Sequence, residues 1–110
     1  MFEKNLNMGY LLDFYGDVLS EKKRNVLDWY YNGDLSLSEI AEEIGISRQG
    51  VRDIIKKTEE ELLFYEERLG LAGKNARATE VIEKAIAVSQ DMEGAEEIRA
   101  RLAELADILK

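Results

Sequence analysis

The sequence SLSEIAEEIGISRQGVRDIIKK, residues 36–57, predicts two helices joined by a tight turn. Ser36 followed three residues later by Glu39 is a capping-box pattern, which starts the first helix. Gly45 ends that helix, because glycine accepts the positive φ of a sharp turn, and Ser47 caps the next one. This combination is typical of a helix-turn-helix, which places its second helix in the major groove of DNA.

The apolar pattern of this stretch holds the two helices together and continues beyond it. Small Ala41 lies where the helices would cross, and with Leu37, Ile40 and Ile44 it forms the buried stripe of the first helix. In the second helix, apolar side chains recur every three or four residues, so we expect it to run from Arg48 to Leu69. We expect Gly70 and Gly73 to break it. Its buried stripe would comprise Val51, Ile54, Ile55, Thr58, Leu62, Tyr65 and Leu69.

A basic face lies beside that stripe at the start of the second helix. Residues 47–57 carry four basic side chains against Asp53 alone, a net charge of +3. The first turn of a recognition helix reaches base edges, and arginine can fork onto guanine and glutamine onto adenine. We therefore assign base contacts to Arg48, Gln49 and Arg52, and phosphate contacts to Ser47, Lys56 and Lys57. The alternative is a solvated face in which Asp53 pairs with Lys56 or Lys57.

The rest of the chain also reads as helical, because it lacks proline and is rich in strong helix formers. Apolar spacing predicts helices over roughly residues 2–19, 21–32, 75–90 and 94–109, the last two forming a hairpin. We expect Leu11, Phe14, Tyr15 and Val18 to be buried, and Trp29, Tyr30 and Tyr31 to belong to the core. The fold class is all-α, with a helix-turn-helix domain at 1–69 and a C-terminal helical hairpin at 70–110.

Composition excludes several kinds of chemistry. The 110 residues include no Cys and no His, which removes disulfides, thiolate and imidazole catalysis, and zinc-thiolate sites. No nucleophile–base pair or glycine-rich phosphate loop is present, so we expect no enzyme, no catalytic residues, no cofactor and no metal. Asp13 and Asp17 interrupt the apolar N-terminal stretch, and no segment reaches the roughly 20 apolar residues of a membrane span. We expect a cytoplasmic protein without membrane contact.

The net charge of −8 does not argue against DNA binding, because it is unevenly distributed. Residues 58–110 carry thirteen acidic side chains against seven basic ones. Most of the negative charge therefore lies after the basic segment 47–57 in the sequence. We expect the carboxylates after Lys57 to form a solvated surface that repels phosphate and orients the duplex. These carboxylates are Glu59, Glu60, Glu61, Glu66, Glu67, Glu96 and Glu97.

Residues 5–69, and above all LLDFYGDVLSEKKRNVLDWYYNGDLSLSEIAEEIGISRQGV, resemble the YlxM-like family of small bacterial helix-turn-helix proteins. The resemblance implies a fold like region 4 of bacterial sigma factors and a DNA-binding regulator. It also implies a link to the signal recognition particle pathway, since the family's gene often lies beside that of the particle's GTPase. This chain departs from the family at Gly50, where alanine is usual, and at Arg52, where an aromatic residue is common. Gly50 lies off the buried stripe, so we expect no packing to offset its cost of about 1 kcal/mol in helix propensity. Residues 70–110 match the family poorly.

Three readings follow for function and partners. The first is a DNA-binding transcription regulator that contacts double-stranded DNA. The second is an adaptor that binds the signal recognition particle's RNA or its GTPase with the same basic face. The third is a structural helical module. Leu63 and Phe64 lie outside the buried stripe, so we also expect a homodimer formed by the late long helix and the C-terminal hairpin. The alternative is a monomer in which the hairpin folds back completely.

Overall fold

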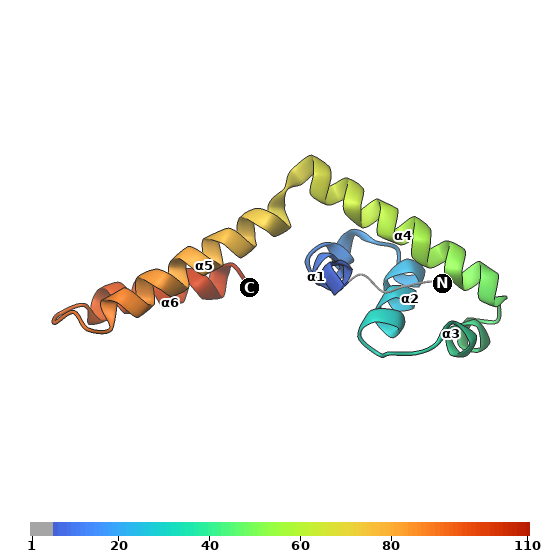
Figure 1. Ribbon diagram of the computed structural model, residues 1–110, viewed down its shortest axis with the longest axis horizontal. Helices are drawn as coiled ribbons and strands as arrows, with labels where there is room; N and C mark the ends of the chain where they lie inside the picture. Colours follow the sequence, from blue (N-terminus) through green and yellow to red (C-terminus); the bar gives the residue numbers. More distant parts are fainter. Residues whose placement is uncertain (1–5) are drawn as a thin grey trace. The chain divides into compact units, whose positions relative to one another are not determined.

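The computed structural model describes residues 6–110, all helical apart from turns (Figure 1). The chain divides into two compact units, the first ending at Gly70 and the second spanning Leu71–Lys110. The first unit contains α1 (Leu6–Tyr15), the 3₁₀ turn η1 (Gly16–Val18), α2 (Glu21–Tyr31), α3 (Leu37–Ile44) and α4 (Arg48–Leu69). The second contains α5 (Leu71–Ser89) and α6 (Glu96–Ile108). The all-α prediction is confirmed.

Local capping explains where the helices of the first unit begin and end. Ser20, Ser36 and Ser47 each cap a helix by accepting a hydrogen bond from the backbone N–H three residues on. At α3 the capping box is complete, because the Glu39 carboxylate also accepts the Ser36 backbone N–H at 3.0 Å. Gly45 and Gly70 end α3 and α4 in the left-handed region, with φ of 74° and 62°.

The core of the first unit lies between α4 and the three helices that pack along it (Figure 1). Its fully buried members come from α2, α3 and α4, so the helix-turn-helix shares one core with the helices before it. Four of the seven residues in the stripe predicted for α4 are fully buried, whereas Ile54 and Tyr65 are half-buried and Leu69 is exposed. The largest fully buried side chains are Val26, Leu27, Ile40, Val51, Ile55, Thr58 and Leu62.

The first predicted helix ends earlier than expected, and its residues 2–5 lie outside the described part of the chain. The winding tightens at Gly16 into η1, which has about three residues per turn and takes Val18 off the buried stripe. Val18 is consequently 64% exposed and Phe14 is also exposed, whereas Leu11 and Tyr15 are buried as predicted. In α2 only Tyr30 of the three aromatic residues is buried; Trp29 and Tyr31 are half-buried.

Three carboxylates of α4 tie this helix to α1 and α2. The buried Tyr15 donates its hydroxyl proton to Glu66 at 2.6 Å, and Lys23 pairs with Glu61 at 2.9 Å. Tyr31 likewise donates to Glu59. All three carboxylates are half-buried, so the expectation of a purely solvated acidic surface is wrong for them. Their partners lie on other helices and hold α4 in place across the unit.

The second unit is an antiparallel hairpin of α5 and α6. The amide of Asn75 near the start of α5 donates to the Leu109 carbonyl just past α6 at 2.6 Å, so these two ends of the hairpin meet. The predicted break at Gly73 is wrong, because α5 already begins at Leu71 and contains Gly73 in its first turn. A glycine there costs about 1 kcal/mol of helix propensity, too little to stop a helix of 19 residues.

Candidate nucleic-acid interface

The turn between α3 and α4 is short and is held by two backbone hydrogen bonds. The backbone N–H groups of Gly45 and Ile46 both donate to the Ala41 carbonyl, at 2.9 and 3.1 Å. Ala41 and Ile40 are buried, so α3 packs closely against α4. This packing fixes the direction in which α4 leaves the turn and presents its first turn at the surface.

The first turn of α4 carries the three side chains that the sequence assigned to base contacts. Arg48, Gln49 and Arg52 are exposed and line one surface hollow of about 350 Å³ together with Leu37 of α3. No acidic side chain stands in the first turn of α4. The helix N-terminus and the two guanidinium groups therefore present positive charge at the same place.

The two lysines that follow are exposed on the same helix but do not line the hollow. Within residues 6–110, neither Lys56 nor Lys57 forms an ion pair. The alternative interpretation of this face, an ion pair between Asp53 and Lys56 or Lys57, therefore does not describe the structure. Asp53 instead accepts a hydrogen bond from the Gln49 amide at 2.9 Å. The lysine ammonium groups are left to solvent or to a ligand.

Ser47 has a structural role that limits what else it can do. Its hydroxyl oxygen accepts the backbone N–H of Gly50 at 3.0 Å, which caps α4. The hydroxyl proton is not used in this bond, so Ser47 can still donate to an anion at the helix N-terminus.

Gly50 is more closely packed than the sequence suggested. It is half-buried, and a Cβ added to it would lie 3.2 Å from Ile46 Cδ1 and 3.3 Å from Ser47 Oγ. The expectation that nothing packs against this glycine is therefore wrong, because the Ile46 side chain lies over it. The absence of a side chain at residue 50 lets the turn fold tightly onto the start of α4.

Sequence reasoning missed one lining residue and one neighbouring surface. Leu37 was expected only in the buried stripe of α3, but it is half-buried and also lines the hollow. Its place directly after the capping serine, in the exposed first turn of α3, was the available signal. A second, acidic hollow lies on α3 and is lined by Leu35, Glu39, Glu42 and Glu43. Within residues 6–110, no group of three or more potential ligand side chains is placed to hold a metal ion.

Comparison with known proteins places these features in a family. A family model described as "Putative helix-turn-helix protein, YlxM / p13 like" matches residues 2–104. A UPF0122 protein of Halalkalibacterium halodurans is 43% identical over 105 residues, 96% of either chain. One from Shouchella clausii is 44% identical over 108 residues, 96% of this chain and 99% of the relative. One from Clostridium kluyveri is 55% identical over 69 residues, 63% of this chain and 62% of the relative.

These matches extend the similarity beyond the stretch from which it was first inferred. The family model reaches residue 104, so limiting the resemblance to residues 5–69 was too narrow. The family is described by its helix-turn-helix and not by a catalytic activity. Among the described helices, none combines the length and apolar character needed to cross a membrane.

Proposed function

Since the chain belongs to the YlxM/p13-like family of helix-turn-helix proteins, we propose that it is a DNA-binding regulator that reads the major groove with the start of α4. The observation that carries this proposal is the shared hollow of Arg48, Gln49 and Arg52 at the N-terminus of α4. Helix N-termini of this kind contact base edges in helix-turn-helix complexes. We place this activity in the cytoplasm, where bacterial DNA lies.

Each side chain of the interface suits a different contact. The guanidinium groups of Arg48 and Arg52 can each bind a guanine edge in two places, and the Gln49 amide can bind an adenine. Leu37 offers an apolar contact of the kind that a thymine methyl group makes. Ser47, Lys56 and Lys57 donate to phosphate oxygens and set the register of the helix on the duplex.

The acidic surface of α3 supports one orientation of the duplex. Glu42 and Glu43 are exposed and line a hollow that shares no lining residue with that of the arginines. Phosphate is repelled there and attracted at the start of α4, so the charge pattern favours approach from the basic side. The local charges therefore matter more for binding than the overall −8.

Structured RNA is the competing ligand for the same basic face. A connection with the signal recognition particle would use the same arginines and lysines on the particle's RNA or GTPase. The two readings differ in the nucleic acid bound, so a test of the proposal must include both. We also propose a homodimer, since two copies would present two recognition helices to two half-sites of a duplex.

Titration of labelled nucleic acid with the full chain at about 50 and about 200 mM salt separates these readings. We expect duplex binding at low salt with an affinity that falls steeply with salt, because several phosphates are neutralised. Replacing Lys56 and Lys57 by Ala should make the fall of log affinity with log salt concentration less steep, by the equivalent of about two phosphate contacts. A matched control is Lys84→Ala with Lys110→Ala, which removes the same charge from the second unit. Binding of structured RNA but not of duplex would replace the DNA proposal by the adaptor reading.

A further inference from the structure

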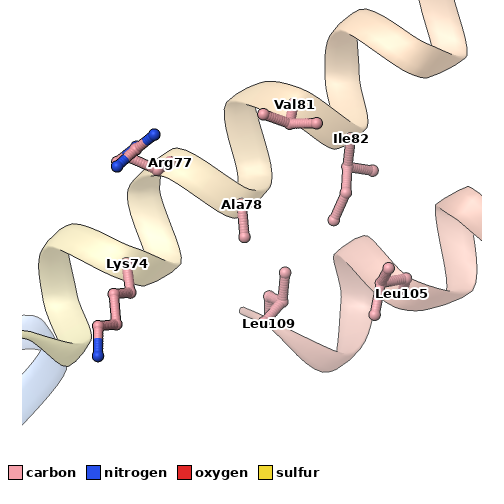
Figure 2. Close-up of a pocket in the computed structure, with 7 residues that line it drawn as sticks. All are labelled: Lys74, Arg77, Ala78, Val81, Ile82, Leu105 and Leu109. Atoms are coloured by element: carbon pink, nitrogen blue, oxygen red, sulfur yellow. The ribbon is translucent and has the colours of Figure 1, made fainter.

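The α5–α6 hairpin carries an open apolar groove (Figure 2). The groove has a volume of about 530 Å³ and is floored by side chains from both helices. Ala78 and Ile82 of α5 point toward Leu105 and Leu109 from the C-terminal end of the chain (Figure 2). Lys74 and Arg77 line the end of the groove where α5 begins.

The hairpin buries too little apolar surface to be stable without further cover. The apolar side chains that it buries are Ala72, Ile82 and Ala95. Units of about 40 residues usually need disulfides, metals or association to fold. Large apolar side chains on both helices remain open to solvent, with Val81 64% and Val88 70% exposed on α5. On α6 and the turn before it, Met92, Ile98, Leu105 and Ile108 are exposed as well.

The cations of the hairpin show what kind of surface the groove would accept. Four of them are already paired with carboxylates of the hairpin: Lys84, Arg99, Arg101 and Lys110. Lys74 and Arg77 have no such pair within the described residues, and both line the groove. An apolar surface with carboxylates at one end would therefore complement the groove.

The turn between α5 and α6, at the other end of the hairpin, combines an apolar side chain with carboxylates. Its turn carries Asp91 and Glu93 on either side of Met92, and all three side chains are exposed. Neither carboxylate forms an ion pair within residues 6–110. Among the residues that the structure describes, the cations at the open end of the hairpin and the carboxylates at its turn therefore have no ion-pair partners.

We propose that the groove binds the α5–α6 hairpin of a second copy of this chain, antiparallel to the first. Lys74 lies eight residues before Ile82, and Asp91 lies nine residues after it. A two-fold axis near Ile82 therefore sets the open end of each hairpin against the turn of its partner, and the interface closes as a symmetric dimer. Val81 and Leu105 would then lie in the core of a four-helix bundle. This inference specifies the dimer suggested with the proposed function, and it holds whether or not DNA is the ligand.

The oligomeric state of the full chain tests this surface directly. Sedimentation equilibrium at micromolar concentration should give twice the monomer mass of 12.6 kDa. Val81→Glu should yield a monomer, because it places a charge in the interface core. Val81 is largely exposed in the single chain, so the variant should keep its helix content, which circular dichroism checks.

Charge reversal distinguishes this arrangement from other dimers. Lys74→Glu with Arg77→Glu, and separately Asp91→Lys with Glu93→Lys, should each weaken dimerisation about tenfold or more through like-charge contacts. Mixing the two variants should restore the dimer, since every contact across the interface is then between opposite charges. Glu83→Lys is the control, because residue 83 is about 180° around α5 from Lys74.

Three results would overturn the proposal. They are a wild-type monomer at all concentrations tested, a dimer that persists with Val81→Glu, and a mixture of the two charge variants that stays monomeric. Duplex binding should be measured on the same samples, because it tests the DNA proposal independently of the dimer. A monomeric wild type that still binds duplex would exclude the dimer alone.

Discussion

The Gln49 side chain donates a hydrogen bond to the carboxylate of Asp53, one helical turn further along α4, at 2.9 Å. The amide best suited to adenine is therefore engaged within the free protein, beside a negative charge. Asp53→Asn should raise duplex affinity several-fold at low salt, because it removes that charge and keeps an acceptor for Gln49. Asp53→Ala removes both the charge and the acceptor.

Comparing these two variants separates charge from hydrogen bonding. If release of Gln49 matters, Asp53→Ala should change the preferred base at one position, whereas Asp53→Asn should raise affinity for all duplexes alike. Titration of duplexes that differ at single positions measures both effects. Equal affinity of both variants and the parent protein would show that Asp53 stays far from the bound nucleic acid.

The hydrogen bond from Tyr15 to Glu66 should stabilise the first unit. Tyr15 is buried and its hydroxyl donates to a half-buried carboxylate at 2.6 Å, so Tyr15→Phe removes a charge-assisted bond. We expect a loss of about 1.5–3 kcal/mol in the free energy of unfolding. Urea denaturation measures it. An unchanged unfolding midpoint for Tyr15→Phe would show that this bond does not hold α1 to α4.

The capping box at the start of α3 predicts how the stability of the protein depends on pH. The Ser36 backbone N–H, and then its hydroxyl, hydrogen-bond to Glu39 and lower the pKa of that carboxyl. A group with a lowered folded pKa stabilises the protein above its unfolded pKa, about 4.3 for glutamate, and loses that effect as pH falls through the folded pKa. Glu39→Gln should therefore lower the stability at pH 7, where the ionised carboxylate contributes, and the two proteins should converge in stability as pH falls below about 4.3. An identical acid profile for both proteins would contradict a role of this carboxylate.

Substitution of Gly50 by alanine compares two opposing effects, a gain in helix propensity and a close contact with Ile46. Gly50→Ala gains about 1 kcal/mol of propensity, but its Cβ would meet Ile46 Cδ1 at 3.2 Å. That methyl is the mobile end of a side chain, so we expect a net stabilisation of about half the propensity gain. In an Ile46→Val background, which lacks Cδ1, the gain from Gly50→Ala should be larger. Thermal unfolding of the four proteins measures this coupling, and equal gains in both backgrounds would mean that Ile46 does not restrain residue 50.

The sequence predicted the boundaries of α3 and α4 well, because their caps are local. Ser36 with Glu39, and Ser47 with Gly50, are three residues apart, so their hydrogen bonds can be inferred from spacing alone. Tyr15 and Glu66 are 51 residues apart, and no periodicity shows that they meet. The partner of Asp53 was also missed, because Gln49 competes with the two lysines for the same carboxylate. Such competition depends on side-chain geometry that spacing does not contain.

Selection of preferred duplexes from a random pool tests the assignment of Arg48 and Arg52 most directly. The wild-type chain should enrich a defined sequence, and Arg48→Ala with Arg52→Ala should bind duplex while enriching none. Each lost base contact should cost about 1–3 kcal/mol on the preferred site. Enrichment of the same sequence by both proteins, or failure of the wild type to bind any duplex at low salt, would contradict base reading by the start of α4.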